Sequence, residues 1–195
     1  MTIALKALYA SLPTRNVGRW GRAGDPLNLL FKGTEPAVCR ALESAGWTRV
    51  PNSIAGSCLA GLKELWQGRK LTRFPPMNAY RVLGRVQDMN WAQTVRPLEE
   101  RHHFRLWKTE LSDSERRPLW WGSGNYDLSI RWIDLSHRPD PDMDFERDHI
   151  ARTLRGSPWV RELELVSLPQ VPRAGSNDKG HAFRNDGRVL IVDLL

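Results

Sequence analysis

The stretch that decides the fold is NYDLSIRW, residues 125–132, in which polar and apolar side chains alternate. An alternation with a period of two is typical of a strand that has one apolar and one polar face. Asp127 lies on the polar face of this predicted strand. The segments 80–83, 89–95, 103–108 and 119–121 are short, rich in aromatic residues and separated by turn residues, as in an antiparallel sheet. We therefore expect the middle of the chain to be mainly β-structure.

Three segments outside this region have the features of helices. Residues 35–45 and 54–66 repeat apolar side chains at helical spacing, and a glycine follows each segment. A third helix is expected over residues 145–154, where Asp142 or Asp144 can cap the first turn. Further strands are predicted over residues 27–33, 161–168 and 188–193. The sequence therefore predicts an α+β fold in which about three helices pack on a mainly antiparallel central sheet.

Length and composition favour a single domain. The chain has 195 residues, of which 41% are hydrophobic and 26% are charged, and this is the mixture of an ordinary globular protein. No apolar run approaches the roughly 20 residues of a membrane-spanning helix. The expected organisation is a lead segment over residues 1–24 and one domain over residues 25–195. The opening residues lack the features of a secretory signal, so a cytoplasmic protein, or one peripheral to the membrane, is expected.

The charge is unevenly distributed. The chain carries a formal net charge of +7, and the excess of basic residues lies mainly in the first hundred positions. A basic exterior keeps a protein soluble, and it also attracts anionic lipids, phosphorylated metabolites or nucleic acid. Nucleic acid is the least favoured partner, because the basic residues form no compact run and no recognition motif is present. The sequence also lacks the phosphate-binding glycine loop, the nucleophile elbow of serine hydrolases and the zinc-protease helix motif.

Two adjacent histidines are the first candidate site. Residues 102 and 103 begin a predicted strand, so their side chains point to opposite faces and only one can face a given pocket. His103 shares its face with Arg105, whereas His102 shares the more apolar face with Phe104 and Leu106. We therefore predict that His103 binds a metal or transfers a proton. The alternative is a histidine that is merely hydrogen-bonded within the sheet.

The second candidate site is the segment from His137 to Asp148, which holds five acidic residues on alternate positions from 140 to 148. Such a series is tolerated when it is solvated, paired with Arg138 and Arg147, used to cap a helix, or shared by a hard cation such as Mg²⁺ or Ca²⁺. An EF-hand is excluded, because the glycine and glutamate that its loop requires are absent. The capped helix with surface ion pairs and the metal or acid–base site both stay open.

The chain resembles the LssY C-terminal domain family over nearly its whole length. The matching motifs are Asp25-Pro26-Leu27-Asn28-Leu29, Ala45-Gly46-Trp47-Thr48, Gly84-Arg85-Val86-Gln87-Asp88, Arg101-His102-His103-Phe104-Arg105-Leu106-Trp107, Asp140-Pro141-Asp142-Met143-Asp144 with Glu146-Arg147-Asp148, and Asp186-Gly187-Arg188. In other members the piece before the Asp-Pro-Asp element often begins with paired histidines. Here it reads Ser136-His137-Arg138-Pro139, which leaves one candidate ligand.

The resemblance implies a poorly characterised family without an established reaction. Its domains stand alone or are joined to membrane proteins with DedA-like or type 2 phosphatidic acid phosphatase modules. One hypothesis is therefore a non-catalytic accessory module that docks on an anionic membrane or on a membrane-associated phosphatase.

The other hypothesis is a hydrolase that depends on a divalent metal (Mg, Mn, Ca or Zn) and acts on a phosphorylated or other anionic substrate. Its candidate metal ligands are His103, His137, Asp142 and Asp144. The candidate catalytic residues are His103, Asp127, Asp148 and Arg188. The candidate ligand-binding residues are Arg101, Arg105, Trp121 and Arg147. Trp121 is included because one member of the Trp120-Trp121 pair is expected to be less buried and able to stack on a ligand.

Overall fold

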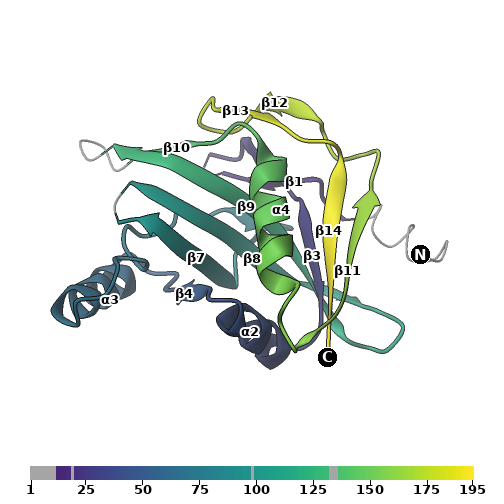
Figure 1. Ribbon diagram of the computed structural model, residues 1–195. Helices are drawn as coiled ribbons and strands as arrows, with labels where there is room; N and C mark the ends of the chain where they lie inside the picture. The colour runs from purple at the N-terminus through teal and green to yellow at the C-terminus, as the bar shows by residue number, and fades with distance from the viewer. Residues whose placement is uncertain (1–11, 19, 98, 132–135) are drawn as a thin grey trace.

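The computed structural model is built on one large sheet (Figure 1), and it describes residues 12–18, 20–97, 99–131 and 136–195. The order of neighbouring strands is β11-β14-β3-β9-β8-β7-β4, and β10 pairs with β9. These strands are β3 (Leu29–Lys32), β4 (Thr48–Val50), β7 (Met89–Arg96), β8 (Glu100–Ser112), β9 (Pro118–Arg131), β10 (Ser136–Pro139), β11 (Val160–Ser167) and β14 (Arg188–Leu194). All their pairings are antiparallel except that of β14 with β3.

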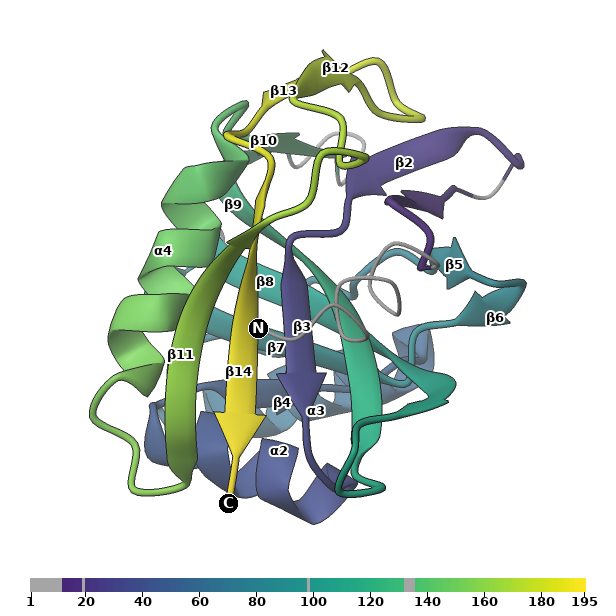
Figure 2. The same cartoon turned by 90° about the vertical axis from the view of Figure 1, so that its right-hand side faces the viewer.

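Two smaller sheets complete the β-structure. The first has the order β2-β1-β5-β6, and the second is the pair β12-β13. Their strands are β1 (Arg15–Val17), β2 (Ala23–Pro26), β5 (Arg81–Val82), β6 (Arg85–Val86), β12 (Ala174–Ser176) and β13 (Ala182–Arg184). Figure 2 shows β2, β5 and β6 on the side of the large sheet that faces away from helix α4. Because β1 pairs with β2, part of the predicted lead segment is built into the fold.

In the described part of the chain the helices are α2 (Glu35–Ser44), α3 (Ile54–Trp66) and α4 (Met143–Leu154). Helix α4 runs across one face of the large sheet, and α2 lies near one end of it (Figure 1). Thr34 and Asp142 cap α2 and α4 by accepting backbone N–H groups with their side chains, as short polar residues do at helix starts. The α+β class and the mainly antiparallel sheet are thus confirmed. In the part of the chain that the structure describes, no helix has the length and apolarity to cross a membrane.

The large sheet has an apolar core on each face. Phe104 and Trp120 belong to the cluster shared with α2 and α4, whereas Trp107 and Trp121 belong to the cluster on the other face. Both tryptophans of the adjacent pair are therefore covered, and only 1% of each is exposed. The expectation that Trp121 stands open to a ligand is wrong, because the second core covers it and its indole N–H donates to the Pro13 carbonyl oxygen.

The prediction of separate strands at residues 119–121 and 125–132 is also wrong, since both belong to the long strand β9. The glycines between them resemble turn residues, but they provide space for neighbouring side chains. A Cβ atom on Gly122 would lie 2.7 Å from Leu106 Cδ2, and one on Gly124 would lie 3.1 Å from Ile150 Cδ1 of α4. Glycine in a strand interior often marks such a close approach.

Candidate functional site

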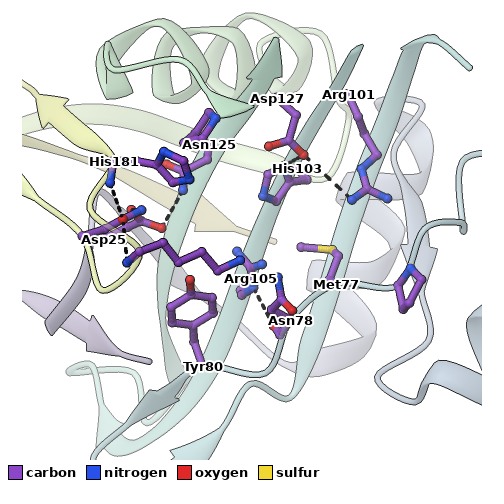
Figure 3. Close-up of a pocket in the computed structure, with 14 residues that line it drawn as sticks. Asp25, Met77, Asn78, Tyr80, Arg101, His103, Arg105, Asn125, Asp127 and His181 are labelled. Atoms are coloured by element: carbon purple, nitrogen blue, oxygen red, sulfur yellow. Dashed lines mark hydrogen bonds and ion pairs between the residues drawn. The ribbon is translucent and has the colours of Figure 1, made fainter. Parts of the chain in front are cut away.

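A polar pocket lies on the face of β8 and β9 that points away from α4 (Figure 3). Alternate residues of a strand share a face, so Arg101, His103 and Arg105 all line this pocket from β8. The strand register places Asp127 opposite Arg101 and Asn125 opposite His103. The regular pairing of β8 with β9 therefore brings Arg101, His103 and Asp127 together in the pocket.

Loops close the rest of the pocket. The other lining residues are Asp25 in β2, Pro76, Met77, Asn78 and Tyr80 between α3 and β5, Pro139 in β10, and Asn177, Lys179 and His181 around the β12–β13 turn. The cavity volume is about 40 Å³, which suits a small polar group more than a whole cofactor. The lining thus contains three basic side chains (Arg101, Arg105 and Lys179), two carboxylates (Asp25 and Asp127) and two histidines (His103 and His181).

The two carboxylates have different partners. Asp127 Oδ2 lies 3.2 Å from His103 Nδ1 and 3.9 Å from Arg101 Nη2. Asp25 accepts hydrogen bonds from the side-chain amides of Asn125, at 2.7 Å, and Asn177, at 3.0 Å. Asp25 thus links β9 to the β12–β13 turn, whereas Asp127 lies beside the imidazole. A carboxylate in this position can orient the imidazole ring and fix its tautomer.

The two arginines of β8 are buried charged groups. Arg105 is only 5% exposed, its Nε donates to the Asn78 carbonyl oxygen, and its guanidinium carbon lies 4.9 Å from the centre of the Tyr80 ring. Within the described ranges, Arg105 forms no ion pair. Arg101 donates from Nη1 to the Pro75 carbonyl oxygen, and its buried Nε has no hydrogen-bond partner in that same part of the chain. Burial lowers the pKa of Arg101, an effect that the nearby Asp127 opposes.

Of the residues predicted from the sequence, four lie together in this pocket: Arg101, His103, Arg105 and Asp127. The structure places Trp121, Asp142, Asp144, Arg147, Asp148 and Arg188 elsewhere. Arg147 is completely buried and pairs with Asp144, Asp148 and Asp186 at 2.6–2.7 Å. Arg188 pairs with Asp186 at 2.6 Å. Hydrogen bonds from Arg188 and Arg147 lower the pKa of Asp186 despite the opposing effect of burial.

This network joins α4 to the turn before β14, since Asp144 also accepts the backbone N–H of Asp186. The roles predicted for Asp148, Arg188 and Arg147 would therefore have to be exercised outside the pocket. A fully buried arginine that satisfies three carboxylates is the usual arrangement of a structural ion-pair network.

The three predicted metal ligands whose side chains the structure describes, His103, Asp142 and Asp144, do not converge. Among the residues that the structure describes, no three His, Cys, Asp or Glu side chains are placed to hold one metal ion. Asp142 caps α4 and pairs with Arg184 at 3.1 Å, and Asp144 belongs to the Arg147 network. His103 faces the pocket, whereas α4 packs on the opposite face of β8. The side chain of His137 lies outside the described residues, so metal binding stays a prediction from the sequence.

A second acid–histidine pair lies directly behind the pocket, under α4. His102 Nδ1 contacts Glu146 Oε2 at 2.5 Å, and the His102 ring stacks on His149 with the ring centres 3.6 Å apart. Burial, with a further contribution from Asp127, raises the pKa of Glu146 well above its ordinary value. Burial lowers the pKa of His102 to about 3, and His149 and Arg152 add to this effect. Burial thus disfavours the charged form of each group.

Several pocket residues were missed by sequence reasoning. Asn125 has the same strand parity as Asp127, so the alternation that singled out Asp127 could have found it. Asp25 belongs to the first of the matching motifs, but that motif assigned it no role. Lys179 and His181 lie in and just after a loop rich in small and polar residues, and no local pattern places such a loop against a distant strand.

Comparison with known proteins gives one result. The family model described as LssY C-terminus matches residues 9–189. No curated protein and no solved structure matches the chain. The match extends from β1 into β14 and includes every described residue of the pocket. The chain belongs to the LssY C-terminus family.

Proposed function

We propose that the domain recognises a small ligand through an anionic group, a phosphate or a carboxylate, in the pocket on β8 and β9. The observation that carries this proposal is the burial of Arg105 without an ion pair among the described residues. Buried charges in proteins are paired or hydrogen-bonded, because an uncompensated buried charge is costly. An anion in the cavity supplies the missing partner.

The second arginine supports the same reading. Arg101 Nε is a buried donor without a partner in the described part of the chain, and Asp127 already lies near the other end of its guanidinium. Guanidinium groups bind phosphate and carboxylate in a bidentate manner. Lys179, which lines the pocket from the β12–β13 turn, adds a third cation. Together these groups suit an anion better than a metal cation.

A hydrolase acting on a phosphorylated substrate is the second candidate function, and the His103–Asp127 pair favours it. A histidine with a carboxylate at Nδ1 can exchange a proton through Nε2 with a water molecule or a leaving group. The arginines stabilise the negative charge that develops on a phosphoryl group during its transfer. The alternative is a non-catalytic accessory module, in which the same pocket binds the anion without turnover.

Calorimetric titration with inorganic phosphate and with acetate tests the binding proposal and distinguishes the two anions. We expect saturable heat with at least one of them, and a loss of at least about tenfold in affinity in Arg105→Gln, because hydrogen bonds to charged groups contribute about 1.5–3 kcal/mol each. Arg161→Gln is the matched control, since Arg161 is exposed and pairs only with Glu115 among the described residues. Equal binding by Arg105→Gln and the wild type would refute the proposal.

Release of nitrophenol from p-nitrophenyl phosphate and bis(p-nitrophenyl) phosphate tests the hydrolase candidate. The His103→Gln variant should lose about a hundredfold or more in rate if the histidine acts as a general acid or base. If the protein binds phosphate but hydrolyses neither ester, the binding proposal stands and the hydrolase candidate is refuted.

A further inference from the structure

Helix α3 is oriented with its apolar side outward. Leu59 is 71% exposed and Trp66 is 88% exposed, and Leu62 and Ala55 are exposed with them. At 100° per residue these four side chains form one stripe, here called the outer face of α3. The sequence correctly predicts an amphipathic helix over residues 54–66. It does not reveal that the apolar face would be left uncovered.

Contacts on the inner face fix this orientation. The buried residues of α3 are Ser57, Gly61 and Glu64, which lie opposite the outer face. Gly61 packs so closely on the following loop that a Cβ atom would lie 2.9 Å from Phe74 Cβ. Glu64 accepts the backbone N–H groups of Thr72 and Arg73 and also pairs with the Arg73 side chain at 3.0 Å. Rolling the helix to bury its leucines would break all of these contacts.

The charges around the outer face are positive. Lys63 borders the stripe, and Arg69 and Lys70 follow the end of the helix; all three are exposed. None of them forms an ion pair with another described residue. The single acidic residue of the helix, Glu64, is buried and neutralised by Arg73. An apolar stripe with basic residues beside it complements a surface that is apolar in its interior and negative at its rim.

We propose that the outer face of α3 is a docking surface for an anionic phospholipid membrane. Leucine side chains enter the boundary of the acyl region, Trp66 lies at the level of the headgroups, and the three basic residues contact anionic lipids. With 13 residues, α3 is about 20 Å long and lies in the plane of the membrane surface. Figure 1 shows α3 at the periphery of the molecule, apart from α2 and α4, where a flat surface can reach it.

Sedimentation of the full chain with vesicles tests this proposal. The probes are vesicles of phosphatidylcholine alone and of phosphatidylcholine mixed with phosphatidylglycerol, each at low and high salt. We expect binding to the mixed vesicles that weakens at high salt, because salt screens the attraction between the headgroups and the basic residues. Binding that is equal on both vesicle types and insensitive to salt would overturn the anionic specificity.

The variants separate the apolar from the electrostatic part. Leu59→Ser combined with Leu62→Ser should lower the partition onto mixed vesicles by at least about tenfold, and Lys63→Gln should lower it by about fivefold. Leu165→Ser, on the exposed part of β11, is the matched control and should bind like the wild type. Circular dichroism and thermal melting confirm that each variant is folded.

One outcome identifies a different occupant. If the wild type ignores all vesicles but is a dimer by light scattering, and the double leucine variant is a monomer, the outer face binds a second copy of the chain and the proposal is overturned. The pocket variant Arg105→Gln should sediment with mixed vesicles like the wild type, so the docking surface and the anion pocket succeed or fail separately.

Discussion

The two faces of β8 carry the same pair of residue types in opposite settings. On one face, His103 lies beside Asp127 in a pocket lined by two arginines and a lysine. On the other, His102 contacts Glu146 beneath α4, surrounded by the rings of Tyr126, Phe145 and His149. An acid–histidine pair is therefore not a functional signal by itself; its surroundings decide what it can do.

The two acid–histidine pairs differ in their burial and in the groups that surround them. The carboxyl group of Glu146 is fully buried between α4 and the sheet, and burial disfavours the charged forms of both Glu146 and His102. The pair on the pocket face lies next to cations and to a cavity that can admit water and a ligand. The α4 face thus suits a structural role, whereas the pocket face is the one at which we propose binding and proton transfer.

The largest expected effect is on the α4 face. Replacing Arg147 with alanine leaves three carboxylates without their shared cation and should destabilise the fold by about 3–5 kcal/mol in urea unfolding. Phosphate affinity should be unchanged under conditions where the variant is folded. A stable variant that has lost phosphate binding would instead make Arg147 the ligand-binding residue that the sequence predicted.

Glu146 should follow the same pattern with a smaller effect. Glu146→Ala creates a cavity and leaves His102 without its partner, so it should cost about 2–4 kcal/mol in unfolding free energy. Glu146→Gln preserves the shape of a neutral carboxyl group and should cost less than about 1 kcal/mol. Equal losses in both variants would show that Glu146 is charged in the folded protein.

Arg105 should show the reverse pattern on the pocket face. Arg105→Gln removes an uncompensated buried charge, so the fold should keep or gain stability while phosphate affinity falls by at least about tenfold. Thermal melting with and without phosphate measures both quantities at once. If Arg105→Gln loses much of its stability in the absence of phosphate, Arg105 has a structural role like that of the residues on the α4 face, and the two faces do not differ in this respect.

The dependence of stability on pH sharpens the comparison. The raised pKa of Glu146 stabilises the fold at pH values below its ordinary 4.5, and this contribution is lost as the pH rises toward the folded value. The lowered pKa of His102 acts oppositely, since its contribution is present above 6.5 and is lost as the pH falls toward about 3. Relative to the wild type, Glu146→Gln should therefore become more stable as the pH rises above 4.5, the ordinary pKa of a glutamate. A difference in urea midpoint that is constant with pH would contradict this account.

The smallest effect is expected for Arg188, whose side chain is 46% exposed. Its pair with Asp186 lies outside the pocket, so Arg188→Gln should change stability by about 0–1 kcal/mol and leave phosphate binding unaltered. A tenfold loss of phosphate affinity would restore the catalytic role that the sequence suggested for this residue.

The sequence predicts the elements of this fold better than their surroundings. Apolar periodicity locates α2 and α3, the capping aspartates locate α4, and strand parity assigns His103 and Arg105 to one face of β8. Periodicity does not predict which neighbouring element covers a given face. The exposure of the apolar stripe of α3 could therefore not be predicted from the sequence.

The candidate site was predicted in part for the same reason. Parity selects His103 over His102, but only the register of β8 with β9 brings Asp127 to the imidazole. The dense charge of the acidic segment from 140 to 148 led us to predict a metal site there. In the structure, Asp142 caps α4, and Asp144 and Asp148 pair with Arg147. Local sequence records which groups are present, and long-range packing decides which of them meet.

The most direct test of the central claim is a crystal of the protein soaked in tungstate, a heavy analogue of phosphate whose position can be seen by anomalous scattering. The account predicts a peak in the pocket within hydrogen-bonding distance of the Arg105 guanidinium and near Arg101. A protein that binds phosphate in solution but places tungstate only at other sites, with the pocket empty, would contradict it.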